Sequence, residues 1–166
     1  MKKTLIAAAA AAVALVAGPA MAQDLESYMN LGYSAIDAEG SDLGAGTIRV
    51  GTTVYQYFGV ELEASLGLVN DGPVGAEIEM DKAAAVYAVG HLPIGENFEV
   101  MARAGWGRAA YAVGPFDVTD SSLNYGVAAQ FTWDQNNGVR ADWTRHDFED
   151  ISLEADVWSL SYVRKF

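Results

Sequence analysis

The stretch GVELEASLGLV, residues 59–69, decides the fold because it alternates strictly between apolar residues and polar or small ones. Val60, Leu62, Ala64, Leu66 and Leu68 form one set, and glutamate, serine and glycine occupy the positions between them. A period of two residues is that of a β-strand, whose successive side chains point to opposite faces. The stretch therefore predicts a strand with one apolar face and one face of polar or small residues.

The same alternation recurs along the chain. It is strict in residues 98–106 and 123–133, and it is weaker in residues 28–35, 47–54, 139–144 and 158–166. Residues 78–91 also suit a strand, although their many alanines leave open which positions share a face. The sequence thus predicts eight strands. Most approach the 9–11 residues, roughly, that a tilted strand needs to cross a membrane.

The connections between these strands alternate between short and long. Residues 56–58, 92–97 and 134–138 are short and contain turn formers such as Pro93, Gly95 and Asn136. Residues 37–45, 70–77, 109–122 and 147–153 form longer, acidic connections. This rhythm predicts an all-β, antiparallel up-and-down barrel with tight turns at one end and acidic loops at the other.

Alternation alone does not decide whether the apolar face meets a protein core or lipid, because a lipocalin-like soluble barrel shows the same pattern. After residue 22, no apolar run approaches the roughly 20 residues of a membrane-spanning helix, which excludes a helical membrane protein. Beyond that point the chain contains only two lysines, Lys82 and Lys165, too few for a solvated strand face. Small residues instead suit the narrow lumen of an eight-stranded barrel. We therefore predict a transmembrane barrel, with the soluble barrel as the alternative.

The ionisable residues of the polar face carry both signs of charge. A buried charge is tolerated when it is paired, and this mixture could pair across the lumen. The predicted ion-pair network comprises Arg49, Glu61, Glu63, Glu99, Arg103, Arg140 and Asp142.

The beginning of the chain has the three parts of a secretory signal peptide. Lys2 and Lys3 precede an apolar stretch over residues 5–17, and Ala20-Met21-Ala22 supplies a small-x-small cleavage pattern. We predict that residues 1–22 are a cleaved signal peptide and that residues 23–166 are the barrel domain. Without Lys2 and Lys3, 8 basic and 22 acidic residues remain, a formal charge of −14 that makes nucleic acid a poor partner. No cysteine occurs, so disulfides and thiolate metal sites are excluded.

Several segments resemble the small outer-membrane barrel superfamily that includes the OmpA transmembrane domain, OmpX and the opacity-type proteins. These segments are GVELE at 59–63, LPIG at 92–95, ARAGWG at 102–107, WTRHDF at 143–148 and WSLSYVRKF at 158–166. The resemblance implies a monomer in the bacterial outer membrane with both termini in the periplasm. The implied partners are outer-membrane lipid and lipopolysaccharide, the barrel-assembly machinery and periplasmic chaperones.

The resemblance also implies that the end of the chain is the signal read by the barrel-assembly machinery. Its aromatic and apolar positions are Trp158, Leu160, Tyr162 and Phe166, and Arg164 departs from the pattern.

Candidate catalytic residues are few. His146 and Asp147 are adjacent, so on a strand they would point to opposite faces and could not hydrogen-bond well. Glu61, Glu63 and Glu99 could act as paired carboxylates, but arginines on the same face favour ion pairing. The acidic loops could bind Ca²⁺ or Mg²⁺ shared with lipopolysaccharide phosphates, yet they lack a dense ligand motif. We expect no enzyme, no cofactor, no metal site and no catalytic residue.

These observations leave two functions open. The first is an envelope structural or surface-interaction protein with a side-chain-filled lumen, acting through its acidic external loops. The alternative is a narrow, porin-like channel for small solutes.

Overall fold

The computed structural model describes residues 26–38, 41–69, 78–113, 116–148 and 154–166. The predicted signal peptide, residues 1–22, lies outside these ranges. The described chain forms eight strands: β1 (Ser27–Ala38), β2 (Ser41–Tyr55), β3 (Phe58–Val69), β4 (Ile78–Ile94), β5 (Phe98–Val113), β6 (Phe116–Thr132), β7 (Asn137–Phe148) and β8 (Glu154–Lys165).

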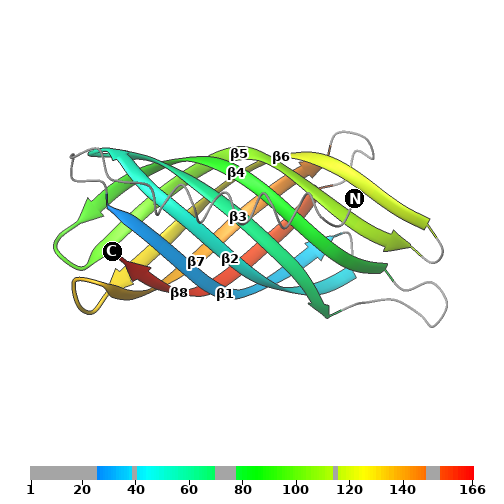
Figure 1. Ribbon diagram of the computed structural model, residues 1–166, viewed down its shortest axis with the longest axis horizontal. Coiled ribbons are helices and arrows are strands. Elements are labelled where there is room, and N and C mark those ends of the chain that lie inside the picture. Colours follow the sequence, from blue (N-terminus) through cyan, green and yellow to red (C-terminus); the bar gives the residue numbers. More distant parts are fainter. Residues whose placement is uncertain (1–25, 39–40, 70–77, 114–115, 149–153) are drawn as a thin grey trace.

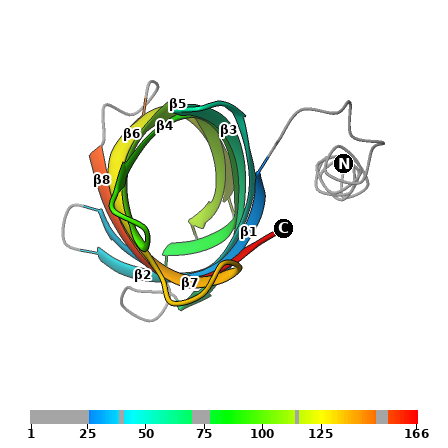
Figure 2. The same ribbon diagram turned by 90° about the vertical axis from the view of Figure 1, so that its left-hand side faces the viewer.

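The strands close into a barrel in sequence order (Figures 1 and 2). Each strand pairs antiparallel with the next, and β1 pairs with β8 from Tyr28 opposite Lys165 to Asp37 opposite Asp156. Closure leaves no strand with unpaired backbone groups along its edge. The predicted all-β, eight-stranded, antiparallel up-and-down barrel is confirmed. Among the described residues, no helix is long and apolar enough to cross a membrane.

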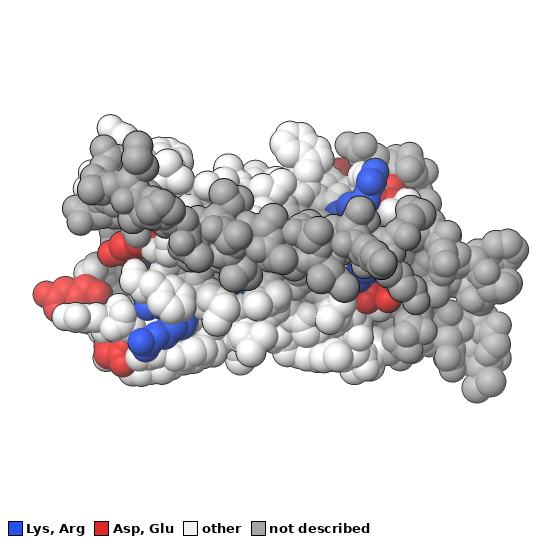
Figure 3. All heavy atoms as spheres, viewed as in Figure 1, with Lys and Arg blue, Asp and Glu red and all other residues white. Residues whose placement is uncertain are grey.

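The outer surface of the barrel is apolar. Leu31, Leu66, Trp106 and Leu160 each expose more than 60% of their surface, and they belong to strands around the barrel. On the face shown in Figure 3, acidic and basic atoms lie toward the two ends, and the described surface between them is mostly uncharged. So large an exposed apolar area indicates contact with lipid.

Aromatic side chains gather on the outer surface toward both ends of the barrel. The exposed aromatic residues near the tight turns are Tyr55, Tyr57, Phe58, Phe98, Phe131, Trp133, Tyr162 and Phe166. Those toward the opposite end are Tyr33, Trp106, Tyr125 and Trp158. Two such girdles mark the two membrane interfaces of a transmembrane barrel.

Two of the four predicted long loops are largely strand. β1 continues to Ala38 and β2 begins at Ser41, while β5 continues to Val113 and β6 begins at Phe116. The predicted loops over 37–45 and 109–122 were therefore too long. Strands β4, β5 and β6 contain 17, 16 and 17 residues, more than the roughly 9–11 that cross a membrane. Where a strand extends beyond the lipid, neither of its faces is required to be apolar. The sequence of that part of the strand therefore need not alternate, and alternation does not reveal it as strand.

The tight turns have the local chemistry that their sequences suggest. Between β4 and β5, Gly95 has a φ of 77°, the left-handed region that glycine adopts without a side-chain clash. Between β6 and β7, the Asp134 carboxylate Oδ1 accepts hydrogen bonds from the backbone N–H groups of Asn136 and Asn137, at 2.8 and 2.6 Å. The hydrogen bond from the Asn137 side chain, followed by that from the Asn136 backbone, lowers the pKa of Asp134 below its ordinary value.

Candidate functional site

The middle of the lumen is occupied by six charged side chains from four strands. They are Arg49 (β2), Glu61 and Glu63 (β3), Arg103 (β5), and Arg140 and Asp142 (β7). No side chain of the six exposes more than 9% of its surface. Three guanidinium groups and three carboxylates give this set, here called the ionic layer, a formal charge of zero.

Glu61 is the most highly connected carboxylate of the ionic layer. Its Oε1 lies 2.9 Å from Arg103 Nη1, and its Oε2 lies 2.6 Å from Arg140 Nη1. The Tyr28 hydroxyl donates to the same Oε2 at 2.9 Å. Each of these bonds ends on a charged group, which makes it stronger than a neutral hydrogen bond.

The other two carboxylates complete the layer. Glu63 Oε2 lies 2.6 Å from Arg49 Nε and 3.0 Å from Arg103 Nη1. Asp142 Oδ1 lies 2.7 Å from Arg140 Nη2, and its Oδ2 lies 3.4 Å from Arg49 Nη1. Each arginine contacts at least two carboxylates, and Arg49 and Arg103 lie within 4.0 Å of all three, so the six charges are compensated where water is scarce.

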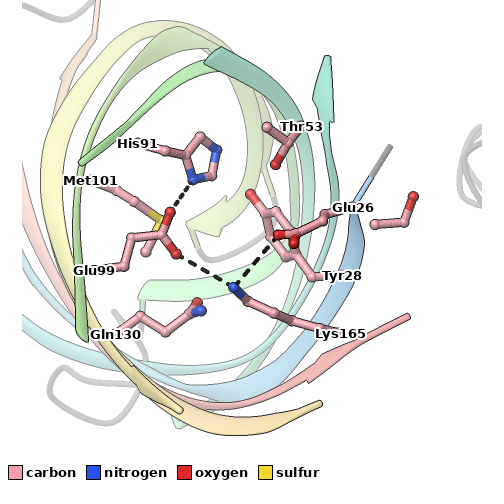
Figure 4. Close-up of a pocket in the computed structure, with 9 residues that line it drawn as sticks. Glu26, Tyr28, Thr53, His91, Glu99, Met101, Gln130 and Lys165 are labelled. Atoms are coloured by element: carbon pink, nitrogen blue, oxygen red, sulfur yellow. Dashed lines mark hydrogen bonds and ion pairs between the residues drawn. The ribbon is translucent and has the colours of Figure 1, made fainter. Parts of the chain in front are cut away.

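Glu99, which the sequence analysis placed in the same network, lies elsewhere. It faces the mouth of the barrel beside the tight turns, where its Oε1 is 2.7 Å from His91 Nδ1 (Figure 4). Its Oε2 is 3.7 Å from Lys165 Nζ, which is 3.9 Å from Glu26 Oε2. Beside this cluster, a hollow of about 280 Å³ opens at the mouth, lined by His91, Glu99 and Lys165 among others. The structure thus brings six of the seven predicted network residues together and leaves Glu99 in a separate group.

Polar residues outside the predicted network support it. The guanidinium carbon of Arg103 lies 4.4 Å from the centre of the Tyr87 ring, a cation–π arrangement. Arg103 Nε also donates to the Thr144 hydroxyl at 3.1 Å. Tyr87 belongs to the strand whose facing the sequence left open; the structure places Tyr87, Val89 and His91 on the inner face. Tyr87 lies four residues before His91, and an even spacing places two residues of a strand on the same face. The surrounding alanines obscured this pattern, because they give both faces of the strand a similar composition.

Beyond the ionic layer, toward the end with the long connections, the lumen holds a band of hydroxyl groups. Ser34 bonds to Thr47 and to Ser159, each at 2.7 Å, and Thr47 bonds to Ser65 at 2.9 Å. Arg49 Nη2 donates to the Ser159 hydroxyl at 3.0 Å, which joins this band to the ionic layer.

An apolar layer then fills the lumen at that end. Its side chains are buried and lie on the same inner face as the hydroxyl band. The members of this apolar layer are Ile36, Leu43, Ala45, Met80, Ala109, Phe148, Ala155 and Val157. The sequence analysis predicted small and charged residues in the lumen and did not foresee this layer. Several members fall in, or beside, segments interpreted as loops.

The candidate catalytic and assembly residues also have clear positions. His146 lies on the inner face and pairs across the sheet with Asn124, whereas Asp147 is exposed on the outside, so the two side chains diverge. Trp158, Leu160, Tyr162 and Phe166 are exposed on the outer side of the barrel wall. Within the part of the chain that the structure describes, no group of three histidine or acidic residues is arranged to hold a metal ion.

Several solved structures similar to this one are small outer-membrane barrels. Ail, the attachment invasion locus protein of Yersinia pestis, has a TM-score of 0.62 and 18% identity over 87% of this chain and 100% of its own. Neisserial surface protein A has a TM-score of 0.60 and 11% identity over 87% and 98% of the two chains. OprG of Pseudomonas aeruginosa has a TM-score of 0.60 and 12% identity over 85% and 95%. At these identities the likeness concerns the fold.

No curated protein matches the sequence of this chain. A family model described as the outer membrane protein beta-barrel domain matches residues 8–166, which is most of the chain. That match agrees with the closed barrel, its apolar outer surface and its polar lumen. The chain belongs to the outer membrane protein β-barrel domain family, whose barrels lie in the bacterial outer membrane.

Proposed function

We propose that the protein is a non-conducting barrel that acts as a structural and surface-interaction protein of the envelope through its acidic external loops. The observation that carries this proposal is the ionic layer, in which Glu61 and Arg140 meet across the lumen with 0% exposure of either side chain. A hydrated ion would have to separate buried charges that are held by several hydrogen bonds each, which is costly.

The apolar layer supports the proposal independently. Leu43, Met80 and Phe148 expose only 2–4% of their surface and come from three different strands. Apolar packing offers no hydrogen-bonding groups to an ion that has lost water, so it forms a second barrier in series with the ionic layer.

We place the acidic loops outside the cell and the termini in the periplasm. β1 begins and β8 ends at the end with the tight turns, and the long connections lie at the opposite end (Figure 1). Small outer-membrane barrels have short periplasmic turns and longer external loops, which supports this orientation.

The surface role that we propose is recognition of basic groups. One structure of Ail holds the heparin analogue sucrose octasulfate, a polyanion. The long connections of this chain include Asp71, Glu77, Glu149 and Asp150, and no lysine or arginine lies within residues 70–77 or 149–153. Like charges repel, so a basic partner suits these loops and a polysulfated one does not.

The same reasoning extends to assembly. Trp158, Leu160 and Tyr162 face outward on β8, and the exposed Phe166 directly follows this strand. The barrel-assembly machinery would read these side chains before closure. Periplasmic chaperones would shield this apolar surface during transit, and lipid would cover it in a monomer. The protein would need no cofactor, and we propose no enzymatic activity.

A narrow channel remains the second candidate because several buried lumenal atoms have no hydrogen-bond partner. Both side-chain polar atoms of Asn30 and the Nε2 atoms of His91 and His146 are among them. Buried polar atoms of this kind ordinarily bind water, so a thin hydrated path through part of the lumen is the feature that favours a channel.

Planar-bilayer recording from the purified, folded barrel distinguishes the two functions. A cold-versus-boiled gel shift first verifies folding. We expect no steady unit conductance from the monomer, because two layers block the lumen. A large, steady unit conductance would overturn the closed-lumen proposal in favour of the channel.

A further inference from the structure

The hollow at the mouth beside the tight turns leads into a small pocket of about 10 Å³ (Figure 4). Five residues line both spaces, namely Glu26, Thr53, His91, Glu99 and Lys165. A volume of this size holds roughly one water-sized group. The mouth therefore offers an open hollow with a narrow polar end.

His91 brings an unpartnered nitrogen to this pocket. Its Nδ1 lies 2.7 Å from Glu99 Oε1, and a carboxylate only accepts, so Nδ1 carries the hydrogen. In the neutral ring, Nε2 is then a hydrogen-bond acceptor. The side chain is 6% exposed, and Nε2 has no hydrogen-bond partner among the described residues. Figure 4 shows this second nitrogen on the side of the ring that faces Thr53, across the pocket from Glu99. A buried acceptor of this kind favours a ligand that donates a hydrogen bond.

The charges around the hollow favour a cation. Its described lining includes the carboxylates of Glu26, Glu96 and Glu99 and one ammonium group, that of Lys165. Lys165 Nζ lies 3.7 Å from Glu99 and 3.9 Å from Glu26, so it makes an ordinary hydrogen bond to neither. The negative excess attracts a second cation and repels an anion.

The other buried histidine, His146, lacks such an entrance. Its Nε2 also has no hydrogen-bond partner within the described chain. Its ring, however, lies 6.3 Å from that of Phe148 in the apolar layer, and it lines neither the pocket nor the hollow. Of these two histidines, only His91 is open to a ligand that enters from the mouth.

We propose that the mouth binds a small alkyl diamine, with one ammonium group in the pocket against His91 Nε2 and Glu99. An ammonium group is about the size of a water molecule and donates hydrogen bonds without accepting any. The alkyl chain occupies the hollow of about 280 Å³, and the second ammonium group lies among the remaining carboxylates of the lining. The site goes beyond the proposed function and is independent of the closed lumen; only its compartment, the periplasm, follows from the proposed orientation.

Calorimetric titration of the full-length folded barrel with 1,4-diaminobutane, in an uncharged detergent, tests the site. We expect saturable binding of one diamine per barrel. Glu99→Gln should weaken it at least roughly tenfold, because a hydrogen bond to a charged group is lost. Lys165→Met should strengthen it, because the competing ammonium group is removed. Asp147→Asn is the matched control: it removes an exposed carboxylate at the other end and should change the affinity less than about twofold. The cold-versus-boiled gel shift verifies that each variant folds.

Two further measurements separate a hydrogen-bonding pocket from general attraction of cations. The same diamine with both nitrogens fully methylated keeps its two charges but has no N–H group, so it should bind at least roughly tenfold more weakly. In ¹⁵N NMR spectra, 1,4-diaminobutane should shift the Nε2 resonance of His91 and leave that of His146 in place.

Equal affinity for the methylated diamine would show attraction of counter-ions only and would overturn the site. Native affinity in Glu99→Gln, no gain in Lys165→Met, or an unchanged Nε2 resonance of His91 would each overturn it as well. None of these results bears on conductance, so failure here leaves the closed lumen standing.

Discussion

Glu61 is the residue on which the ionic layer most depends, since Tyr28, Arg103 and Arg140 all donate to it. Glu61→Gln keeps the shape of the side chain but leaves one arginine charge without compensation. We expect the free energy of unfolding, measured by urea titration in lipid vesicles, to fall by about 3–5 kcal/mol.

Glu99→Gln is the control for that substitution. Glu99 is 17% exposed at the mouth, and its partners are His91 and Lys165. Its loss should cost about 1 kcal/mol or less, as for ion pairs in contact with water. Equal losses in the two variants would contradict the distinction between a buried ionic layer and a solvated cluster.

Gly51 provides a packing test of the same region. A Cβ atom at this position would lie 2.3 Å from Tyr28 Cζ, so the ring would have to move away from Glu61. We expect Gly51→Ala to lower the free energy of unfolding by about 1–3 kcal/mol. Gly46→Ala, on the outer face of the same strand, meets only the flexible end of Leu68 at 3.3 Å and should cost less. A larger loss in Gly46→Ala would show that Tyr28 is not the constraint.

At this scale, alternation predicted which charged side chains face inward but not which of them meet. Arg140 and Glu61 are 79 positions apart in sequence and come from β7 and β3. Their contact depends on the tilt and stagger of strands, which no local pattern records. Glu99 shares a strand and a face with Arg103 but precedes it by four residues, about 13 Å along a strand. A prediction that used the height of each residue along its strand, as well as the face it occupies, would have separated Glu99 from the network.

Among the elements, the β6–β7 turn has a testable dependence on pH. Hydrogen bonds from Asn137 and Asn136 favour the charged form of Asp134 and lower its pKa in the folded state. The stabilisation is therefore complete above the ordinary aspartate pKa and is lost as the pH falls through the lowered, folded value.

Asp134→Ala measures this contribution. At about pH 7, above the ordinary aspartate pKa, the native protein should have the higher urea midpoint, and the difference should shrink as the pH falls below about 3.8. Asp147→Ala, at an exposed position near the other end of β7, is the control and should show no such narrowing. A midpoint difference independent of pH would contradict a role for the charged carboxylate.

The strands themselves were predictable where the membrane imposes a pattern and obscure where it does not. Strict alternation located β3, the turn half of β5 and much of β6 because one face meets lipid and the other the lumen. In β4, Ala83 and Ala85 face inward while Ala84 and Val86 face outward, so both faces carry small apolar residues. The external ends of β5 and β6 lie beyond this constraint, which is why they resembled loops.

For the whole molecule, the closed barrel followed from the sequence, but the order of layers inside it did not. The apolar layer escaped prediction because Leu43 lies in a segment interpreted as a loop and Phe148 lies in another. An apolar residue facing inward also breaks the rule that the apolar face of such a barrel meets lipid. Because of the apolar layer, the lumen is closed by two barriers in series, and the ionic layer is only one of them.

Conductance of paired variants tests whether the two barriers are redundant. Arg140→Ser/Asp142→Ser removes two contacting groups of opposite charge, so the ionic layer stays neutral while it loses bulk. Leu43→Ala/Phe148→Ala removes bulk from the apolar layer. In planar bilayers we expect each double variant to remain non-conducting, because barriers in series block the path while either is intact. We expect the combined quadruple variant to show unit conductance.

Recordings are made on material that shows the cold-versus-boiled gel shift. Steady conductance from the Arg140/Asp142 variant alone would show that the ionic layer is the sole barrier. A silent but folded quadruple variant would show that the hydroxyl band formed by Ser34, Thr47, Ser65 and Ser159 also closes the lumen.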